Sequence, residues 1–234
     1  MKKKNKKKVL IIGGDAGLGK SLSFYLNNKN FDVTSTTKKK NNKKKIYLNL
    51  KNKHLDFKKL SNQLKNHKFD YVLFIAAITN SSKEIANQNC TFGNFKYSDF
   101  SKLMEVNCFA NIKLFEFFKK EKILKRDSII IFFSSLAGSI THRGTLKHNK
   151  PFGNLFYRLS KAALNCAIKN FSYDFKNKFT ILALHPGFVK TKSGGKNADF
   201  TVSYATQKIF EVMKKINKKH NGSFIDLHGK KLKW

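Results

Sequence analysis

A glycine-rich turn directly follows a short apolar run near the start of the chain, and this pairing limits the possible folds more than any other feature. The run is VLII at 9–12, and the turn that follows it is GGDAGLGKS at 13–21. A turn of this kind between a strand and a helix brings backbone N–H groups and a helix N-terminus against phosphate, because unpaired donors and the helix dipole stabilise an anion there. We therefore expect a strand–turn–helix unit that binds a nucleotide.

The turn fits two phosphate-binding patterns. Counted from Gly14 it is G-x-x-x-x-G-K-S, the P-loop of nucleotide triphosphatases. Counted from Gly13 it is G-x-x-x-G-x-G, a dinucleotide turn with one residue more between its first two glycines than the common G-x-G-x-x-G. At this point both kinase-like and dehydrogenase-like chemistry remain open.

Length and composition favour one domain over residues 1–234, because single α/β domains commonly reach about 200–250 residues. Hydrophobic residues make up 41% of the chain, which is enough for a sizeable core.

The lysines at 2–4 and 6–8 precede an apolar run that is too short for a secretory or membrane-spanning segment. Cys90, Cys108 and Cys166 lack the spacing of a zinc site or disulfide framework, so no metal is predicted and a cytoplasmic location is expected.

The formal net charge of +34 suggests a nucleic-acid partner at first sight. Only three of the 48 basic residues are arginine, namely Arg126, Arg143 and Arg158. Arginine is the side chain that reads base edges and phosphates bidentately, whereas the lysines are spread over all segments. We predict no specific nucleic-acid partner.

Short apolar runs alternate with segments of helical periodicity along the whole chain. Strands are predicted at 9–12, 31–37, 46–50, 71–77, 128–133, 179–184 and 223–227, and helices after the glycine turn, around 55–64, and at 97–120, 156–175 and 201–218. This rhythm predicts an α/β fold, a single Rossmann-type doubly wound parallel sheet of about seven strands flanked by helices. Its ligand is expected outside the carboxyl ends of the strands.

Later strand ends favour the dehydrogenase interpretation. A P-loop enzyme needs an aspartate at the end of an apolar strand to hold Mg²⁺, and the only acidic strand end is Asp226, in a short segment at the C-terminus. Tyr157 and Lys161 stand one helical turn apart, and Ser135 follows the preceding strand. An ammonium beside the phenol would lower its pKa and make it a competent acid or base. Asn107 is a polar residue inside an apolar helix pattern.

The chain resembles the short-chain dehydrogenases/reductases over essentially its whole length. The segments YRLSKAALN at 157–165, ALHPGFVKT at 183–191 and GSFID at 222–226 are similar to the C-factor/sniffer-type carbonyl-reductase branch. The resemblance implies that Tyr157 is the acid/base, that Lys161 lowers its pKa and binds the nicotinamide ribose, and that Ser135 orients the carbonyl. Asn107 would hold a water that links Lys161 to solvent.

The resemblance also implies a cofactor site. It comprises the turn residues Gly13, Gly17, Leu18 and Gly19, the strand-end residues Lys38, Ala76 and Ala77, the catalytic Tyr157 and Lys161, and the nicotinamide segment with Pro186, Gly187, Val189 and Thr191. Ile12 and Ala76 depart from the family pattern, which usually has polar residues there. NADP(H) is favoured over NAD(H), because lysines and no acidic residue follow the second strand.

The sequence thus predicts an NAD(P)-dependent oxidoreductase that transfers hydride between nicotinamide and a small carbonyl or alcohol substrate. The alternative is a weakly catalytic or non-catalytic regulatory or interaction protein on the same dinucleotide-binding fold. Segments 139–156 and 188–203 are expected to form the substrate loops. The family resemblance implies a homodimer or homotetramer.

Overall fold

The computed structural model describes residues 6–40, 42, 45–50, 55–79, 82, 92–144 and 153–234. In these residues seven strands form one parallel sheet, β1 (Lys8–Ile12), β2 (Asp32–Thr37), β3 (Ile46–Tyr47), β4 (Phe69–Phe74), β5 (Leu124–Phe133), β6 (Phe179–His185) and β7 (Phe224–Asp226). The strand order is β3-β2-β1-β4-β5-β6-β7. The order reverses between β1 and β4, so a ligand site is expected outside the carboxyl ends of these two strands.

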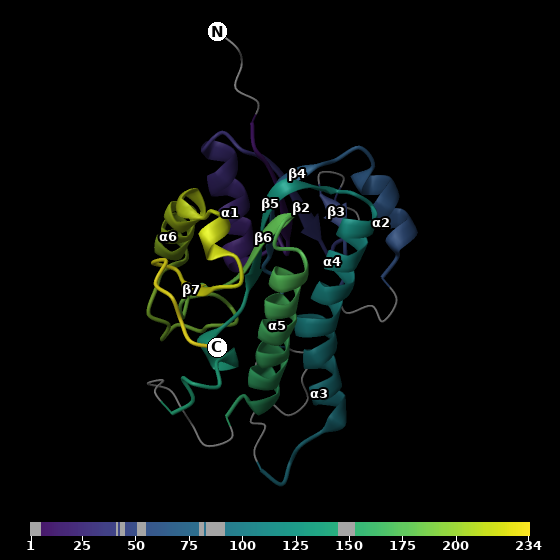
Figure 1. Cartoon of the computed structure of the whole chain (residues 1–234). Helices are drawn as coiled ribbons and strands as arrows, with labels where there is room; N and C mark the ends of the chain where they lie inside the picture. The colour runs from purple at the N-terminus through teal and green to yellow at the C-terminus, as the bar shows by residue number, and fades with distance from the viewer. Residues whose placement is uncertain are drawn as a thin grey trace.

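Helices cover both faces of the sheet, as Figure 1 shows. They are α1 (Gly17–Asn28), α2 (Phe57–Leu64), α3 (Tyr97–Met104), α4 (Ala110–Lys120), α5 (Leu155–Asp174) and α6 (Val202–Lys215). α1 and α6 pack together on one face, and α3, α4 and α5 lie on the other (Figure 1). The predicted doubly wound parallel sheet is confirmed. In the part of the chain that the structure describes, no helix is both long and apolar enough to cross a membrane.

Side chains of the central strands alternate between two hydrophobic cores. In β1, Val9 and Ile11 pack toward α1 and α6, whereas Leu10 and Ile12 pack toward the opposite helices. All four are fully or almost fully buried. This explains why the central strands read as continuous apolar runs, because a strand covered on both faces needs apolar residues at every position.

Several predicted elements have different bounds, and the strand expected at 128–133 begins earlier, at Leu124. The strand expected at 71–77 ends at Phe74, because the next two N–H groups both donate to the carbonyl of Ile12. The strand expected at 46–50 keeps only Ile46–Tyr47 as a strand. The helix expected at 201–218 ends at Lys215, because the backbone of the next residue, Ile216, is extended.

The helix expected at 97–120 is interrupted by one turn of π-helix at Glu105–Phe109. The wider turn leaves carbonyl groups without their usual partners, and the Asn111 side chain supplies a donor. Its Nδ2 atom lies 2.8 Å from the carbonyl oxygen of Asn107 and 3.3 Å from that of Val106. The interruption places Asn107 at an irregular point of the helix, where π-turns are frequently functional.

Candidate active site

The glycine turn closes onto the ends of β2 and β4. Gly13 N donates to Thr36 Oγ1 at 3.0 Å, and Gly14 N donates to the carbonyl oxygen of Thr36 at 3.2 Å. Gly13 has a φ of +103°, and a Cβ atom on it would lie 2.8 Å from the nitrogen of Ala76. A Cβ atom on Gly19 would lie 2.1 Å from the carbonyl oxygen of Gly13. Only glycine fits at these two positions, so the turn can present bare backbone to a ligand.

The helix after the turn begins without a side-chain cap. α1 starts at Gly17, Ala16 makes no capping hydrogen bond, and the first turn carries no acidic residue. The leading N–H groups of the helix and its dipole therefore favour an anion at this end. The Leu18 side chain is buried in the core between α1 and α6, so Leu18 can meet a ligand only through its backbone.

The hydroxyl group that would bind metal in a P-loop makes a different contact in this structure. Ser21 Oγ accepts a hydrogen bond from Thr206 Oγ1 of α6 at 2.8 Å. In a P-loop that hydroxyl holds Mg²⁺ beside the phosphates. Here it joins two helices on the same face of the sheet.

The second predicted cofactor segment reaches the glycine turn. A Cβ atom on Gly17 would lie 3.2 Å from Thr191 Cγ2, so the two segments are in contact. Thr191 Oγ1 accepts a hydrogen bond from Gly194 N at 3.1 Å, and Val189 pairs with Phe200 in an isolated bridge. The Val189 side chain is buried in the core. The structure thus brings the predicted segments 13–19 and 186–191 together at the carboxyl ends of the strands.

Ser135, Tyr157 and Lys161 meet at the carboxyl end of β5. Ser135 follows this strand and caps the short 3₁₀ helix Leu136–Gly138. Tyr157 and Lys161 lie one turn apart on α5, and the Tyr157 side chain hydrogen-bonds with Ser135. Lys161 Nζ lies 5.9 Å from the centroid of the Tyr157 ring and donates to the carbonyl oxygen of Phe133 at 2.8 Å.

A tight contact holds α5 against the end of β5. A Cβ atom on Gly138 would lie 2.7 Å from the carbonyl carbon of Lys161. Asn165 Nδ2 donates to the carbonyl oxygen of Gly138 at 3.2 Å, and the Ser134 hydroxyl donates to Asn165 Oδ1. Asn165 is therefore a positioning residue that sequence reasoning did not single out. The sequence could have indicated Asn165, because it stands one helical turn beyond Lys161 on the same helix face.

The pKa of Tyr157 and that of Lys161 are both governed mainly by burial. Burial raises the pKa of Tyr157, and the hydrogen bond with Ser135 lowers it by less. Burial also lowers the pKa of Lys161 to about 8, against a smaller opposing effect of Cys108. In this structure burial outweighs the effects that lower the phenol's pKa, and the Lys161 ammonium donates to the carbonyl oxygen of Phe133. The Tyr157 phenol is therefore neutral at neutral pH. The predicted role of Lys161 stays a prediction.

Asn107 joins the loop after β4 to α5. Its Oδ1 atom accepts from Ile78 N at 2.8 Å, and its Nδ2 atom donates to the carbonyl oxygen of Ile78 and to Ser160 Oγ. These bonds use both N–H groups of the Nδ2 atom and one of the two lone pairs of Oδ1, and they fix the segment that contains Ala76 and Ala77. The predicted contact of Asn107 with Lys161 through a water stays a prediction.

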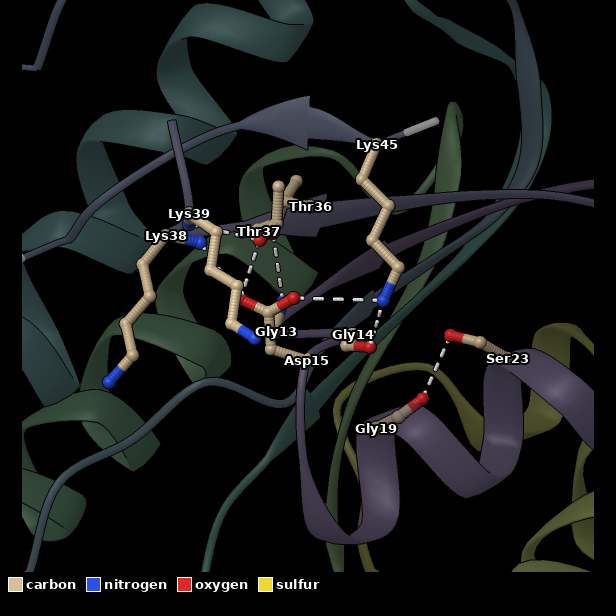
Figure 2. A network of polar contacts seen from close by, with 10 residues as sticks. All are labelled: Gly13, Gly14, Asp15, Gly19, Ser23, Thr36, Thr37, Lys38, Lys39 and Lys45. Carbon is tan, nitrogen blue, oxygen red and sulfur yellow. Dashed lines mark hydrogen bonds and ion pairs between the residues drawn. The ribbon is translucent and has the colours of Figure 1, made fainter. Parts of the chain in front are cut away.

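A polar network at the end of β2 was not predicted (Figure 2). Asp15 Oδ2 accepts from Thr37 Oγ1 and from Lys38 N, each at 2.8 Å. Lys45 Nζ lies 3.6 Å from Asp15 Oδ1 and donates to the carbonyl oxygen of Gly14 at 2.6 Å. Asp15 is the one acidic residue of the turn and could have been noticed, whereas Lys45 lies in a lysine-rich stretch that singles out no residue.

Comparison with known proteins decides between the two interpretations of the glycine turn. A sequence model of the short chain dehydrogenase family matches residues 7–201. The chain belongs to this family. The family predicted from the sequence is thus confirmed, and the P-loop interpretation is wrong.

Among curated proteins, this short-chain dehydrogenase is 28% identical to the C-signal protein of Myxococcus xanthus over 149 residues, which cover 62% of this chain and 84% of that one. Among solved structures it is similar to an NADPH-bound carbonyl reductase from chicken fatty liver, with a TM-score of 0.82, 23% identity, and coverage of 99% and 100%. The carbonyl reductase Sniffer of D. melanogaster gives a TM-score of 0.78 at 24% identity, with 98% and 100% coverage. At these identities the structural likeness concerns the fold.

Proposed function

We propose that this short-chain dehydrogenase is an NAD(P)-dependent carbonyl reductase, with Tyr157 as the acid that protonates the substrate oxygen. The observation that carries the proposal is the meeting of Ser135, Tyr157 and Lys161 at the carboxyl end of β5, on the same side of the sheet as the glycine turn after β1. Because its raised pKa keeps the phenol protonated at neutral pH, Tyr157 holds a proton that it can give to the oxygen of a carbonyl substrate.

The residues of the turn fit a dinucleotide. Gly13 and Gly19 let the turn close tightly, because a Cβ atom at either position would clash with backbone atoms, and the uncapped start of α1 suits the pyrophosphate. The backbone of Ala76 and Ala77, and the segment that runs from Pro186 through Gly187 to Thr191, would line the rest of the site. A bound nicotinamide cofactor would supply the hydride. NADP(H) is the proposed form, as in the carbonyl reductase whose structure holds NADPH.

Each catalytic side chain has a separate task in this proposal. Ser135 donates a hydrogen bond to the carbonyl oxygen and holds it in reach of Tyr157. Tyr157 transfers its proton to that oxygen as negative charge develops there. Lys161 places a positive charge beside the phenol, which stabilises the phenolate that remains. Asn107 keeps the loop after β4 and α5 at a fixed separation through its three hydrogen bonds.

We propose that segments 139–156 and 188–203 shape the substrate pocket within a single domain of residues 1–234. Of the first segment, residues 145–152 lie outside the described residues. Ile140, at its start, is exposed and follows the 3₁₀ helix that carries Ser135. A cytoplasmic homodimer or homotetramer is the proposed form. Phe109, in the π-turn before α4, and Leu159 of α5 are both exposed and would lie at its interface.

A second candidate function is supported by the likeness to C-signal, a protein named for signalling. In that case the fold would bind a dinucleotide and act in regulation or interaction with little turnover. The two functions share the glycine turn and differ in their need for Tyr157.

A cofactor-coupled screen of the purified full chain separates these functions. We expect oxidation of NADPH in the presence of at least one aldehyde or ketone from a broad panel, and kcat/KM higher with NADPH than with NADH. Tight NADPH binding without turnover across the panel would favour the regulatory function. A preference for NADH would contradict the assignment of NADP(H).

A further inference from the structure

The network at the end of β2 lies where a dinucleotide-binding fold receives the adenosine ribose. In such folds an acidic group at this strand end accepts from the ribose 2′-OH, whereas a basic group accommodates a 2′-phosphate. Here the strand ends in Thr36 and Thr37, and the acidic group comes from the glycine turn instead, as Asp15 (Figure 2). A basic group, Lys45, is in contact with that acid.

Lys45 is held in place before any ligand arrives. Its Nζ atom donates to the carbonyl oxygen of Gly14 at 2.6 Å and lies 3.6 Å from Asp15 Oδ1, and the side chain is only 25% exposed. Lys38, Lys39 and Lys40 are exposed, and Figure 2 shows the Lys38 side chain running away from the carboxylate. A lysine loses much rotamer freedom when it binds a ligand, so an ammonium that is already fixed contributes more to affinity.

The charge of Asp15 is already compensated. One carboxylate oxygen accepts from Thr37 Oγ1 and Lys38 N, and the other faces Lys45. Close by along the chain, Lys38, Lys39 and Lys40 add three further positive charges. A doubly charged phosphate therefore meets a net positive site, in which the carboxylate serves to hold the lysine and the backbone after β2.

We propose that Lys45 is the side chain that binds the adenosine 2′-phosphate of NADP(H), and that Asp15 is its positioning residue. This inference rests on the proposed function, because it concerns the cofactor of that reaction. It assigns the main contact to a tethered lysine before β3, in place of Lys38 directly after β2.

Calorimetric titration of the full chain tests the assignment without any turnover. The probes are adenosine 2′,5′-bisphosphate against adenosine 5′-monophosphate, and NADPH against NADH. Lys45→Met should weaken binding of the two ligands that carry the 2′-phosphate about tenfold or more, as the loss of a charge-assisted contact implies. Binding of the two ligands without it should change less than about twofold.

Two lysine variants serve as comparisons. Lys219→Met removes an exposed charge from the short helix after α6 and should leave all four titrations unchanged. Lys38→Met should weaken binding of the 2′-phosphate ligands less than Lys45→Met does. A larger loss for Lys38→Met, or equal losses for ligands with and without the phosphate, would overturn the proposal.

Asp15→Asn tests the positioning role. It should weaken binding of adenosine 2′,5′-bisphosphate a few-fold, and it should have almost no effect when Lys45 is already methionine. Tighter binding in either background would show that Asp15 repels the phosphate, and would overturn this part of the proposal. If the wild-type chain bound neither NADPH nor NADH, the proposed function itself would fail, which is a different outcome from loss of discrimination at Lys45.

Discussion

Replacing Tyr157 by phenylalanine should reduce kcat about 10²- to 10⁴-fold, the usual contribution of a positioned acid. The ring and its packing against the core remain, while the proton donor and its bond with Ser135 are lost. NADPH should bind Tyr157→Phe nearly as tightly as it binds the wild type, because the glycine turn and the segment 186–191 are unchanged. Steady-state kinetics with the best carbonyl of the panel, together with a fluorescence titration of NADPH, measure both quantities.

Tyr173 offers a matched control for this variant. It lies on the same helix, is 72% exposed, and contacts Lys176 at the surface. Tyr173→Phe should leave kcat and NADPH affinity unchanged. Turnover that survived in Tyr157→Phe would remove the acid from the proposed mechanism, whereas an equal loss in both variants would point to a general effect on α5.

Replacing Lys161 by methionine should abolish most turnover and yet make the protein more stable near pH 7. The side chain is 2% exposed, and burial moves the pKa of its ammonium from 10.5 to about 8. Keeping the charge buried costs roughly 3 kcal/mol at neutral pH. Loss of the hydrogen bond to Phe133 offsets about 1 kcal/mol, so a net gain of about 2 kcal/mol is expected.

The same variant should change how stability depends on pH. For Lys161 the pKa is lower in the folded than in the unfolded chain, so the unfolded chain binds more protons between about pH 8 and 10.5. The cost is fully present below pH 8 and fades as the pH rises through this window, so the wild type gains stability there. Lys161→Met should lack this rise.

Denaturant unfolding at about pH 7 and pH 9.5 measures both effects, at values below the ordinary pKa of tyrosine. Lys219→Met, which removes an exposed lysine, serves as the control and should behave like the wild type at both pH values. A Lys161→Met protein that was less stable than the wild type at pH 7 would mean that Lys161 stabilises the fold, and that its burial carries no cost.

The order of strands and helices could be predicted because burial leaves a direct mark on the sequence. Central strands need apolar residues on both faces, as in 9–12 and 128–133, and the helices show apolar positions at regular spacing. Ser135 stands just beyond the strand predicted at 128–133, Tyr157 stands near the start of the helix predicted at 156–175, and Lys161 lies one turn further along that helix. The family was predicted from the resemblance of segments such as 157–165 and 183–191 to the short-chain dehydrogenases/reductases.

Other features depend on contacts between distant segments. The π-turn at Glu105–Phe109 is stabilised by one side chain, Asn111, and its residues keep the pattern of an ordinary helix. The pairing of Asp15 with Lys45 crosses from the glycine turn to the residue before β3. The raised pKa of Tyr157 depends on how deeply α5 packs against β5. None of these contacts follows from local periodicity or spacing.

As a carbonyl reductase, this short-chain dehydrogenase should pass hydride from a nicotinamide to a carbonyl carbon. NADPH that carries deuterium at the reactive carbon of the nicotinamide, supplied with the best substrate of the panel, tests this most directly. Mass spectrometry of the product should show an alcohol that holds one deuterium on its carbinol carbon for each cofactor consumed. An alcohol without the label, or consumption of the cofactor without an alcohol product, would contradict the account.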